Sequence, residues 1–267
     1  MGQKLSEEQI AAHWRTARKG KTLSQSELRA LYEFEADARG YENTGSLIFS
    51  QEPIHDVVLA MVRDYPCSTI LDAGCGPNPI LDLAWMQSGS SVVALEYCFG
   101  FSRYAYRRAR ANGRALVVIN GDVSSLPFRS NSFDGCVCTE TLEHTLEPSK
   151  ALSEIRRVLK RNGRLFLTVP NENSTYAFYL WLLCFLMPWK QARISFEEHP
   201  SHLQHFSRSR LYRLFSGFFE IERSYSIGFS KRPFLQQPVE YALGKIVQLP
   251  FLRSLSGSHA FVLRVCK

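Results

Sequence analysis

From Ser68 onward, short apolar runs alternate with amphipathic helical segments, and this pattern constrains the fold more than any other feature. Regular strand-then-helix alternation is typical of a parallel sheet with helices on both faces, joined by right-handed crossovers. The predicted strands are 69–73, 92–95, 115–119, 133–138, 164–169, 218–226 and 260–265. The predicted helices between them are 80–87, 101–111, 150–160 and 207–216.

A helical segment precedes this alternation. Ser6 and Ser24 each stand before acidic and then apolar residues, which predicts two capped helix starts within residues 1–50. Apolar residues at helical spacing predict a third helix over 51–64. We therefore expect an N-terminal helical cap at 1–50 and one large domain at 51–267, with an insert at 172–206 after the fifth strand.

The composition is that of an ordinary globular chain of 267 residues, with 45% hydrophobic and 21% charged residues. The net charge of +7 would suit an acidic partner, but without a dense basic run we do not expect nucleic acid to be bound. The seven cysteines form no framework and predict a reducing compartment, hence a cytoplasmic protein.

No stretch is long enough to span a membrane. Residues 1–21 lack the apolar core of a secretory signal peptide. The apolar run at 176–189 is shorter than the roughly 20 residues that a spanning helix needs. Its Trp and Lys at the end would suit a peripheral membrane contact, and membrane association therefore stays open.

A Gly-x-Gly turn with an acid before it follows the first predicted strand: Asp72 precedes Gly74 and Gly76. Ligands of such sheets bind beyond the carboxyl ends of the strands. The dinucleotide fingerprint needs a third glycine where this chain has Pro79. A carboxylate would also repel a pyrophosphate, whereas it suits a cationic ligand such as S-adenosylmethionine.

Three further signals follow later predicted strands. Glu96 comes about 20 residues after the glycines, where an acid can accept both hydroxyls of a ribose. Asp122, after Gly121, could accept from an adenine amine. The third signal is the segment 126–128 followed by 132–134, in which we expect Asp134 to be structural.

Together, these features resemble a class I S-adenosylmethionine-dependent methyltransferase of the ubiquinone/menaquinone type (type 11). The residues that carry the resemblance are 70–78, 121–128, 132–138 and 142–144, together with Glu96. The resemblance covers about residues 66–171. It implies a seven-stranded Rossmann-like sheet, mostly parallel, whose last strand is antiparallel. Asn78 stands at the family's usual third glycine, and asparagine tolerates left-handed φ. The residues implied to bind the cofactor are Asp72, Ala73, Gly74, Gly76, Glu96, Tyr97, Asp122, Val123 and Thr139.

Candidate catalytic groups follow the fourth strand, at Glu140, Glu143 and His144. His144 could be a general base for a hydroxyl acceptor. Alternatively, these three residues with His202 or His205 could bind a divalent cation, which would resemble metal-assisted O-methyltransferases of RNA or of quinone precursors. The third alternative is a purely structural role, in which residues 142–144 form the start of a helix. We assign no metal ligand.

The sequence thus predicts a cofactor-dependent enzyme that methylates a small, rather apolar acceptor, at oxygen by preference. By resemblance, the N-terminal helices and the insert at 172–206 would cover the acceptor. Two alternatives from other classes are a non-catalytic cofactor-binding partner protein and a nicotinamide-dependent oxidoreductase; Asp72 and Pro79 argue against the second.

Overall fold

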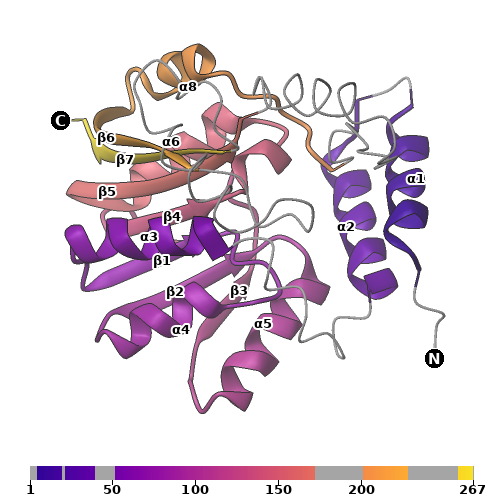
Figure 1. Ribbon diagram of the computed structural model, residues 1–267, viewed down its shortest axis with the longest axis horizontal. Helices are drawn as coiled ribbons and strands as arrows, with labels where there is room; N and C mark the ends of the chain where they lie inside the picture. The colour runs from indigo at the N-terminus through magenta and orange to yellow at the C-terminus, as the bar shows by residue number, and fades with distance from the viewer. Residues whose placement is uncertain (1–4, 20–21, 40–51, 172–200, 228–257, 267) are drawn as a thin grey trace, which may run out of the picture.

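The computed structural model describes residues 5–19, 22–39, 52–171, 201–227 and 258–266 (Figure 1). The predicted insert at 172–206 lies mostly outside these residues, and so does its apolar run at 176–189. Within the described residues, no helix is long and apolar enough to cross a membrane.

Seven strands of the described chain form one sheet in the order β3-β2-β1-β4-β5-β7-β6. Strands β1 to β5 pair in parallel, and β7 runs antiparallel to both of its neighbours. The predicted seven-stranded, mostly parallel sheet with an antiparallel last strand is confirmed. Its strands are β1 (Thr69–Ala73), β2 (Ser91–Glu96), β3 (Val117–Asn120), β4 (Phe133–Thr139), β5 (Leu159–Pro170), β6 (Phe219–Ile227) and β7 (Ser258–Val265).

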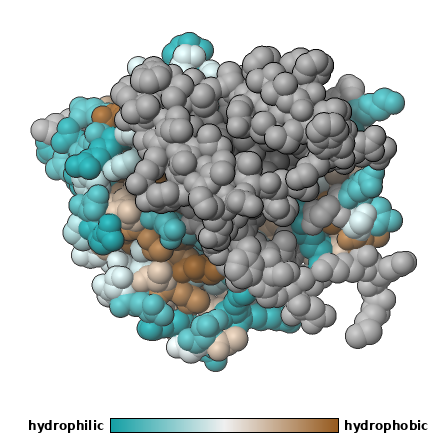
Figure 2. All heavy atoms as spheres, viewed as in Figure 1, coloured by the Kyte–Doolittle hydropathy of each residue, from teal (hydrophilic) through white to brown (hydrophobic). Residues whose placement is uncertain are grey.

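Neighbouring residues of a strand point to opposite sides of the sheet, so the buried apolar strands give the sheet two apolar faces. Helices cover both of these faces. Ile70 of β1 packs in a cluster with α3 and α4, whereas Leu71 packs in a cluster with α6 and α8. Hydrophobic residues gather around α3 and α4 in Figure 2. The helices are α1 (Glu7–Arg18), α2 (Gln25–Arg39), α3 (Glu52–Asp64), α4 (Ile80–Gln87), α5 (Phe99–Ala111), α6 (Pro148–Val158) and α8 (Arg208–Phe215).

Both predicted N-terminal helices begin at their serines. The Ser6 hydroxyl accepts from the Gln9 amide at 3.2 Å, and the Gln9 side chain accepts from the Ser6 amide at 2.8 Å. Ser24 and Glu27 exchange the same pair of bonds before α2. These reciprocal bonds satisfy amides that a helix start leaves without partners.

The pair α1–α2 stands beside the sheet (Figure 1) and is joined to the domain through the start of α5. The Glu33 carboxylate of α2 accepts from the amides of Phe99 at 2.5 Å and Gly100 at 2.9 Å. A Cβ at Gly100 would lie 2.7 Å from the Cβ of Ala36. The glycine thus lets α2 approach closely, and the N-terminal dipole of α5 favours the Glu33 charge.

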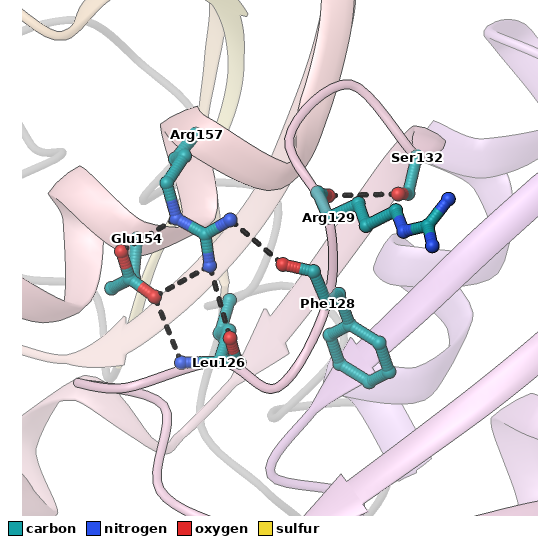
Figure 3. Close-up of polar contacts among 6 residues, drawn as sticks. All are labelled: Leu126, Phe128, Arg129, Ser132, Glu154 and Arg157. Atoms are coloured by element: carbon teal, nitrogen blue, oxygen red, sulfur yellow. Dashed lines mark hydrogen bonds and ion pairs between the residues drawn. The ribbon is translucent and has the colours of Figure 1, made fainter.

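A side-chain network holds the loop between β3 and β4 against α6 (Figure 3). Arg157 donates to the carbonyls of Leu126 at 2.9 Å and Phe128 at 2.7 Å. The Glu154 carboxylate accepts from Arg157 at 2.7 Å and from the Leu126 amide at 2.9 Å. The network fixes a loop that begins at the carboxyl edge of the sheet.

Asp134 has the structural contacts expected of it. Its carboxylate accepts from the amide of Thr69 at 3.0 Å, from the hydroxyl of Thr69 at 2.8 Å, and from Lys160 at 2.8 Å. These bonds tie the starts of β1, β4 and β5 together. The ammonium of Lys160 and the donors of Thr69 outweigh burial and lower the pKa of the Asp134 carboxyl.

The predicted boundary between the third crossover helix and the fifth strand was wrong. The pattern placed residues 159 and 160 at the end of the helix, but α6 ends at Val158 and β5 begins at Leu159, which pairs with Phe133. The register then shifts before Gly135 pairs with Arg164. Asn162, at φ +66°, turns the chain between the two parts of the strand.

We expect Arg157→Ala to lower the free energy of unfolding by about 1–2 kcal/mol, because two loop carbonyls and Glu154 lose a charged donor. Arg129→Ala, in the same loop but exposed, is the matched control and should change it by less than about 0.5 kcal/mol. Urea unfolding followed by circular dichroism measures both.

The effect of Arg157 should also depend on pH. Hydrogen bonds from Arg157 lower the pKa of Glu154, so this stabilisation is present above the unfolded-state pKa and is lost as the pH falls through the lowered pKa. The gap between wild type and Arg157→Ala should therefore narrow in acid. A gap that widens in acid would contradict this account.

Candidate functional site

A cavity of about 500 Å³ opens at the carboxyl ends of the central strands. Residues that follow β1, β2, β3 and β4 line it, and α2 contributes Gln25, Leu28, Tyr32 and Glu35. Because adjacent parallel strands end at the same edge, signals far apart in the sequence meet here. The volume is that of a typical small-molecule site.

The Gly-x-Gly loop needs its glycines. Gly74 has φ +103° and Gly76 has φ +62°, a region that favours glycine. A Cβ at Gly74 would lie 2.3 Å from the hydroxyl oxygen of Thr141. Asn78 is not among the residues with positive φ, so the left-handed conformation considered for it is not used.

The amides of this loop are bonded within the protein. Those of Gly74 and Cys75 donate to the carbonyl of Leu95 at 2.8 and 3.1 Å. The amide of Gly76 donates to the Glu96 carboxylate at 3.0 Å. A phosphate-binding loop directs such amides at its ligand, so this loop is not built to receive a pyrophosphate.

Glu96 lies at the end of β2 and is buried, with 8% exposed. Its second oxygen accepts from the amide of Cys98 at 2.8 Å. Burial raises the pKa of Glu96 to about 7, despite hydrogen bonds from backbone amides that lower it. A ligand that donates hydrogen bonds from two hydroxyls would stabilise the ionised form of this buried carboxyl.

The predicted adenine end lies under the first turn of α2. Asp122 accepts from the Ser124 amide at 2.7 Å and from Gln25 at 3.2 Å. The Tyr97 hydroxyl donates to the Gln25 carbonyl at 2.7 Å. Asp122, Val123 and Tyr97 all line the cavity, and Gln25 covers them.

Thr139 and Ala73, which are also predicted to bind the cofactor, differ in whether they line the cavity. Thr139 lines the cavity, and its buried hydroxyl has no hydrogen-bond partner among the described residues. Ala73 does not line the cavity: it is fully buried and packs in the core cluster beside Leu71 and Leu95. Its position follows from the alternation of side chains along β1.

Sequence reasoning missed an acid at the methionine end of the predicted site. Asp82, on α4, is 1% exposed, lines the cavity and is within hydrogen-bonding distance of Asp72. Burial is the main cause that raises the pKa of each carboxyl, to about 7 for Asp82. The signal was available, since Asp82 is the one charged residue of an otherwise apolar helix start.

The tyrosine and acid that α2 contributes were also missed. The Tyr32 ring lies edge-on to His144, with centroids 6.0 Å apart. Glu35 accepts from the Trp14 indole at 3.0 Å and from Arg39 at 2.7 Å. Only the docking of α2 on the sheet edge brings these side chains into the cavity, so no local pattern marks them.

Glu140 lies in the cavity with strained backbone, at φ +47°. Burial raises the pKa of its carboxyl to about 7, although hydrogen bonds with the hydroxyls of Thr168 and Ser258 lower it. Leu142–His144 that follow form a single 3₁₀ turn rather than the start of an α-helix.

Glu143, His144 and His202 meet in the cavity. One ligand atom from each lies within 4.8 Å of the others. Nδ1 of His144 lies 3.0 Å from the carbonyl of Ser201, and Nε2 lies 3.8 Å from Glu143. Because a carbonyl only accepts, Nδ1 carries hydrogen and Nε2 faces Glu143.

The other members of the predicted cation set lie outside this group. His205 is exposed and does not line the cavity. Glu140 lines the cavity but is not among the three clustered residues. The backbone carbonyl of Glu143 accepts from the amides of Leu203 and Gln204, which holds His202 beside the turn.

Part of this chain matches a known domain. Residues 71–167 match the family described as "Methyltransferase domain". A demethylmenaquinone methyltransferase of Thermobifida fusca is 27% identical over 142 residues, which are 53% of this chain and 60% of that protein. A malonyl-[acyl-carrier protein] O-methyltransferase of Erwinia pyrifoliae is 30% identical over 141 residues, 53% of this chain and 51% of that protein. The chain spans about half the length of the curated relatives it matches.

Solved structures share the fold. A SAM-dependent methyltransferase from Methanosarcina mazei has a TM-score of 0.55 at 21% identity, over 77% of this chain and 96% of that one. The [4+2]-cyclase SpnF has a TM-score of 0.63 at 19% identity, over 91% of this chain and 97% of that one. Since proteins with different named reactions share it, the fold by itself does not decide the reaction.

The close approach of Gly74 and Thr141 predicts a steep cost of substitution. We expect Gly74→Ala to lower the free energy of unfolding by about 2–4 kcal/mol, from positive φ and overpacking together. Gly76→Ala is the matched control, because its φ is positive but a Cβ there meets nothing within 4 Å; it should cost about 1–2 kcal/mol. Equal losses in denaturant unfolding would show that contact with Thr141 does not matter.

Proposed function

We propose that this chain, which belongs to the class I S-adenosylmethionine-dependent methyltransferases through its domain at 71–167, methylates a small, rather apolar acceptor at oxygen. Its cofactor is S-adenosylmethionine. The substrate class and the attacked atom are the proposal. The name of the malonyl-[acyl-carrier protein] O-methyltransferase supports oxygen as the attacked atom, and that of the demethylmenaquinone methyltransferase supports an apolar acceptor.

One observation carries the choice of cofactor. The amides of Gly74, Cys75 and Gly76 are bonded to Leu95 and Glu96, so the loop offers carboxylates rather than amides to its ligand. Carboxylates repel a pyrophosphate and attract a cationic amine or sulfonium. This favours S-adenosylmethionine over a nicotinamide dinucleotide.

The residues present fit this cofactor. Glu96 would accept from the ribose hydroxyls, Asp122 from the adenine amine, and Asp72 from the methionine ammonium. Buried polar atoms without partners among the described residues support the fit, since Asn78 Oδ1 and both Asp82 oxygens lie at the same end of the cavity. Such atoms are rare in proteins unless a ligand pairs with them.

The cofactor supplies a methyl group on a positively charged sulfur, already activated for displacement. The protein must therefore orient an acceptor and remove its proton. His144 is the candidate base, because its hydrogen on Nδ1 points to Ser201 and leaves Nε2 able to accept a proton. Tyr32 and Leu146 line the same part of the cavity and would exclude water.

A second candidate is metal-assisted O-methylation, favoured by the clustering of Glu143, His144 and His202. Nε2 of a neutral histidine and a buried carboxylate are common ligands of divalent cations, and the bond from Nδ1 to Ser201 is the support that such ligands usually have. A bound cation would lower the pKa of an acceptor hydroxyl.

The cofactor is tested by calorimetric titration with S-adenosylhomocysteine and, in parallel, NADH. We expect the first ligand alone to bind, and Glu96→Ala to weaken it by about 10- to 100-fold, because hydrogen bonds to a charged group contribute roughly 1.5–3 kcal/mol. Binding of NADH alone would overturn the proposal. Tight cofactor binding with no transfer to any acceptor would favour the non-catalytic alternative.

The role of His144 is tested by turnover, with demethylmenaquinone and malonyl-carrier protein as first acceptors. We expect His144→Ala to lower turnover by about 100-fold or more while the affinity for S-adenosylhomocysteine stays within about twofold. Unchanged turnover would remove the proposed base.

The metal alternative has its own test, a titration of the apo protein with Mg²⁺ or Zn²⁺. Binding that His202→Ala abolishes and the exposed control His205→Ala retains would favour metal assistance. Absence of binding in the wild type would eliminate it.

A further inference from the structure

The acidic pair Asp72 and Asp82 is a feature that the proposed function uses only in part. Asp72 ends β1 directly before the glycine loop, and Asp82 lies in the first turn of α4, directly after it. Asp72 is 4% exposed and Asp82 is 1% exposed, and both line the cavity. The loop therefore holds one buried acid on each side.

No described group outside the pair donates a hydrogen bond to Asp82. Both of its carboxylate oxygens are buried without a partner from any other described residue except Asp72, and Oδ1 of the nearby Asn78 has no partner in that part of the chain either. The indole Nε1 of Trp85, one turn further along α4, also lacks a partner among the described residues and does not reach Asp82. A bond across the pair, which the distance allows, requires a proton on one carboxyl.

The groups outside the pair that shift the pKa of Asp72 or Asp82 add no positive charge. Glu96 raises the pKa of Asp72, and the nearby thiols stay neutral because burial raises their pKa values. No Lys or Arg among the described residues contributes to the pKa of either acid. The groups that face the pair or share its end of the cavity are Glu96, Cys75, Cys136, Cys138 and His55.

We infer that Asp82 is a second cofactor-binding carboxylate, and that it and Asp72 together hold the α-ammonium group of the cofactor in exchange for the proton they share. This inference rests on the proposed function, since the ammonium belongs to the methionine end of S-adenosylmethionine. An ammonium carries three donors and no acceptor, so it satisfies oxygens on two carboxylates at once. Its positive charge also removes the cost of two buried, ionised neighbours.

The exchange conserves charge and protons. Without ligand, the pair carries one proton and a charge of −1. When the ammonium enters, both carboxyls ionise and the proton passes to solvent. Burial raises the pKa of both carboxyls, and repulsion by Asp82 raises that of Asp72 further, which keeps that proton in place near neutral pH. Binding should therefore release close to one proton per site at pH 7.

Two ligands separate this inference from the proposed function. S-adenosylhomocysteine carries the amino-acid end, whereas 5′-methylthioadenosine has the same nucleoside thioether without it. Titration calorimetry of the full chain, in two buffers of different ionisation enthalpy, gives affinity and proton release for each. We expect the wild type to release about one proton with the first ligand and almost none with the second.

The variant Asp82→Asn keeps the shape of the side chain but removes its charge. We expect it to weaken S-adenosylhomocysteine 10- to 100-fold, to abolish the proton release, and to leave 5′-methylthioadenosine within twofold. Asp56→Asn, an exposed acid on the neighbouring α3, is the matched control and should change neither ligand. Thermal melts of the apo proteins check that both variants fold.

Several results would overturn the inference. Equal weakening of both ligands would mean that Asp82 shapes the cavity and does not bind the ammonium. An unchanged affinity for S-adenosylhomocysteine would mean that Asp72 suffices. Binding of Mg²⁺ alone that Asp82→Asn abolishes would make the pair a cation site. If the wild type binds neither nucleoside, the proposed function fails with the inference; if it binds both and the variant has no selective effect, only the inference fails.

Discussion

The hydrogen bond from the Gly76 amide to the Glu96 carboxylate joins the ends of the neighbouring strands β1 and β2 at the edge where the cavity opens. It links the loop after β1 to the end of β2, and the Leu95 carbonyl adds two more bonds from the same loop. These bonds decide which polar groups the loop shows to a ligand. Because the amides of Gly74, Cys75 and Gly76 are bonded within the protein, the loop presents carboxyl groups to the cavity.

The cavity is acidic although the chain as a whole carries a net charge of +7. Five buried carboxyl groups line it, and burial raises the pKa of Asp82 and Glu96 to about 7 and that of Asp72 well above its ordinary value. Such groups cost stability near neutral pH unless a ligand compensates them, because a charge in low dielectric is poorly solvated. The buried oxygens of Asp82 and Asn78, which have no partner outside the acid pair among the described residues, add a cost that a cationic ligand would relieve. The buried acids that line the cavity are Glu35, Asp72, Asp82, Glu96 and Glu143, and the half-buried Glu140 lines it as well.

The N-terminal helices belong to the site as well as to the fold. Glu33 fastens α2 to the start of α5, and Gln25 reaches Asp122 at the far end of the cavity. Between them, Tyr32 lies beside His144. Because α2 touches both the predicted nucleoside end and the predicted base, its docking defines the cavity's outer wall.

The sequence by itself determined the sheet, most element boundaries and the cofactor end of the site. Strand-helix alternation is local, and residues at the ends of parallel strands meet whatever the details of packing, so Asp72, Glu96 and Asp122 could be grouped in advance. Local pattern failed where pairing across the sheet decided the outcome, as at Leu159, which pairs with Phe133 and joins β5. Only the tertiary structure showed that Tyr32 and Glu35 line the cavity, that His202 rather than His205 meets His144, and that Asp82 faces Asp72. The physical reason is that these contacts depend on how separate elements dock, and docking is set by the packing of whole faces rather than by the residues that end up touching.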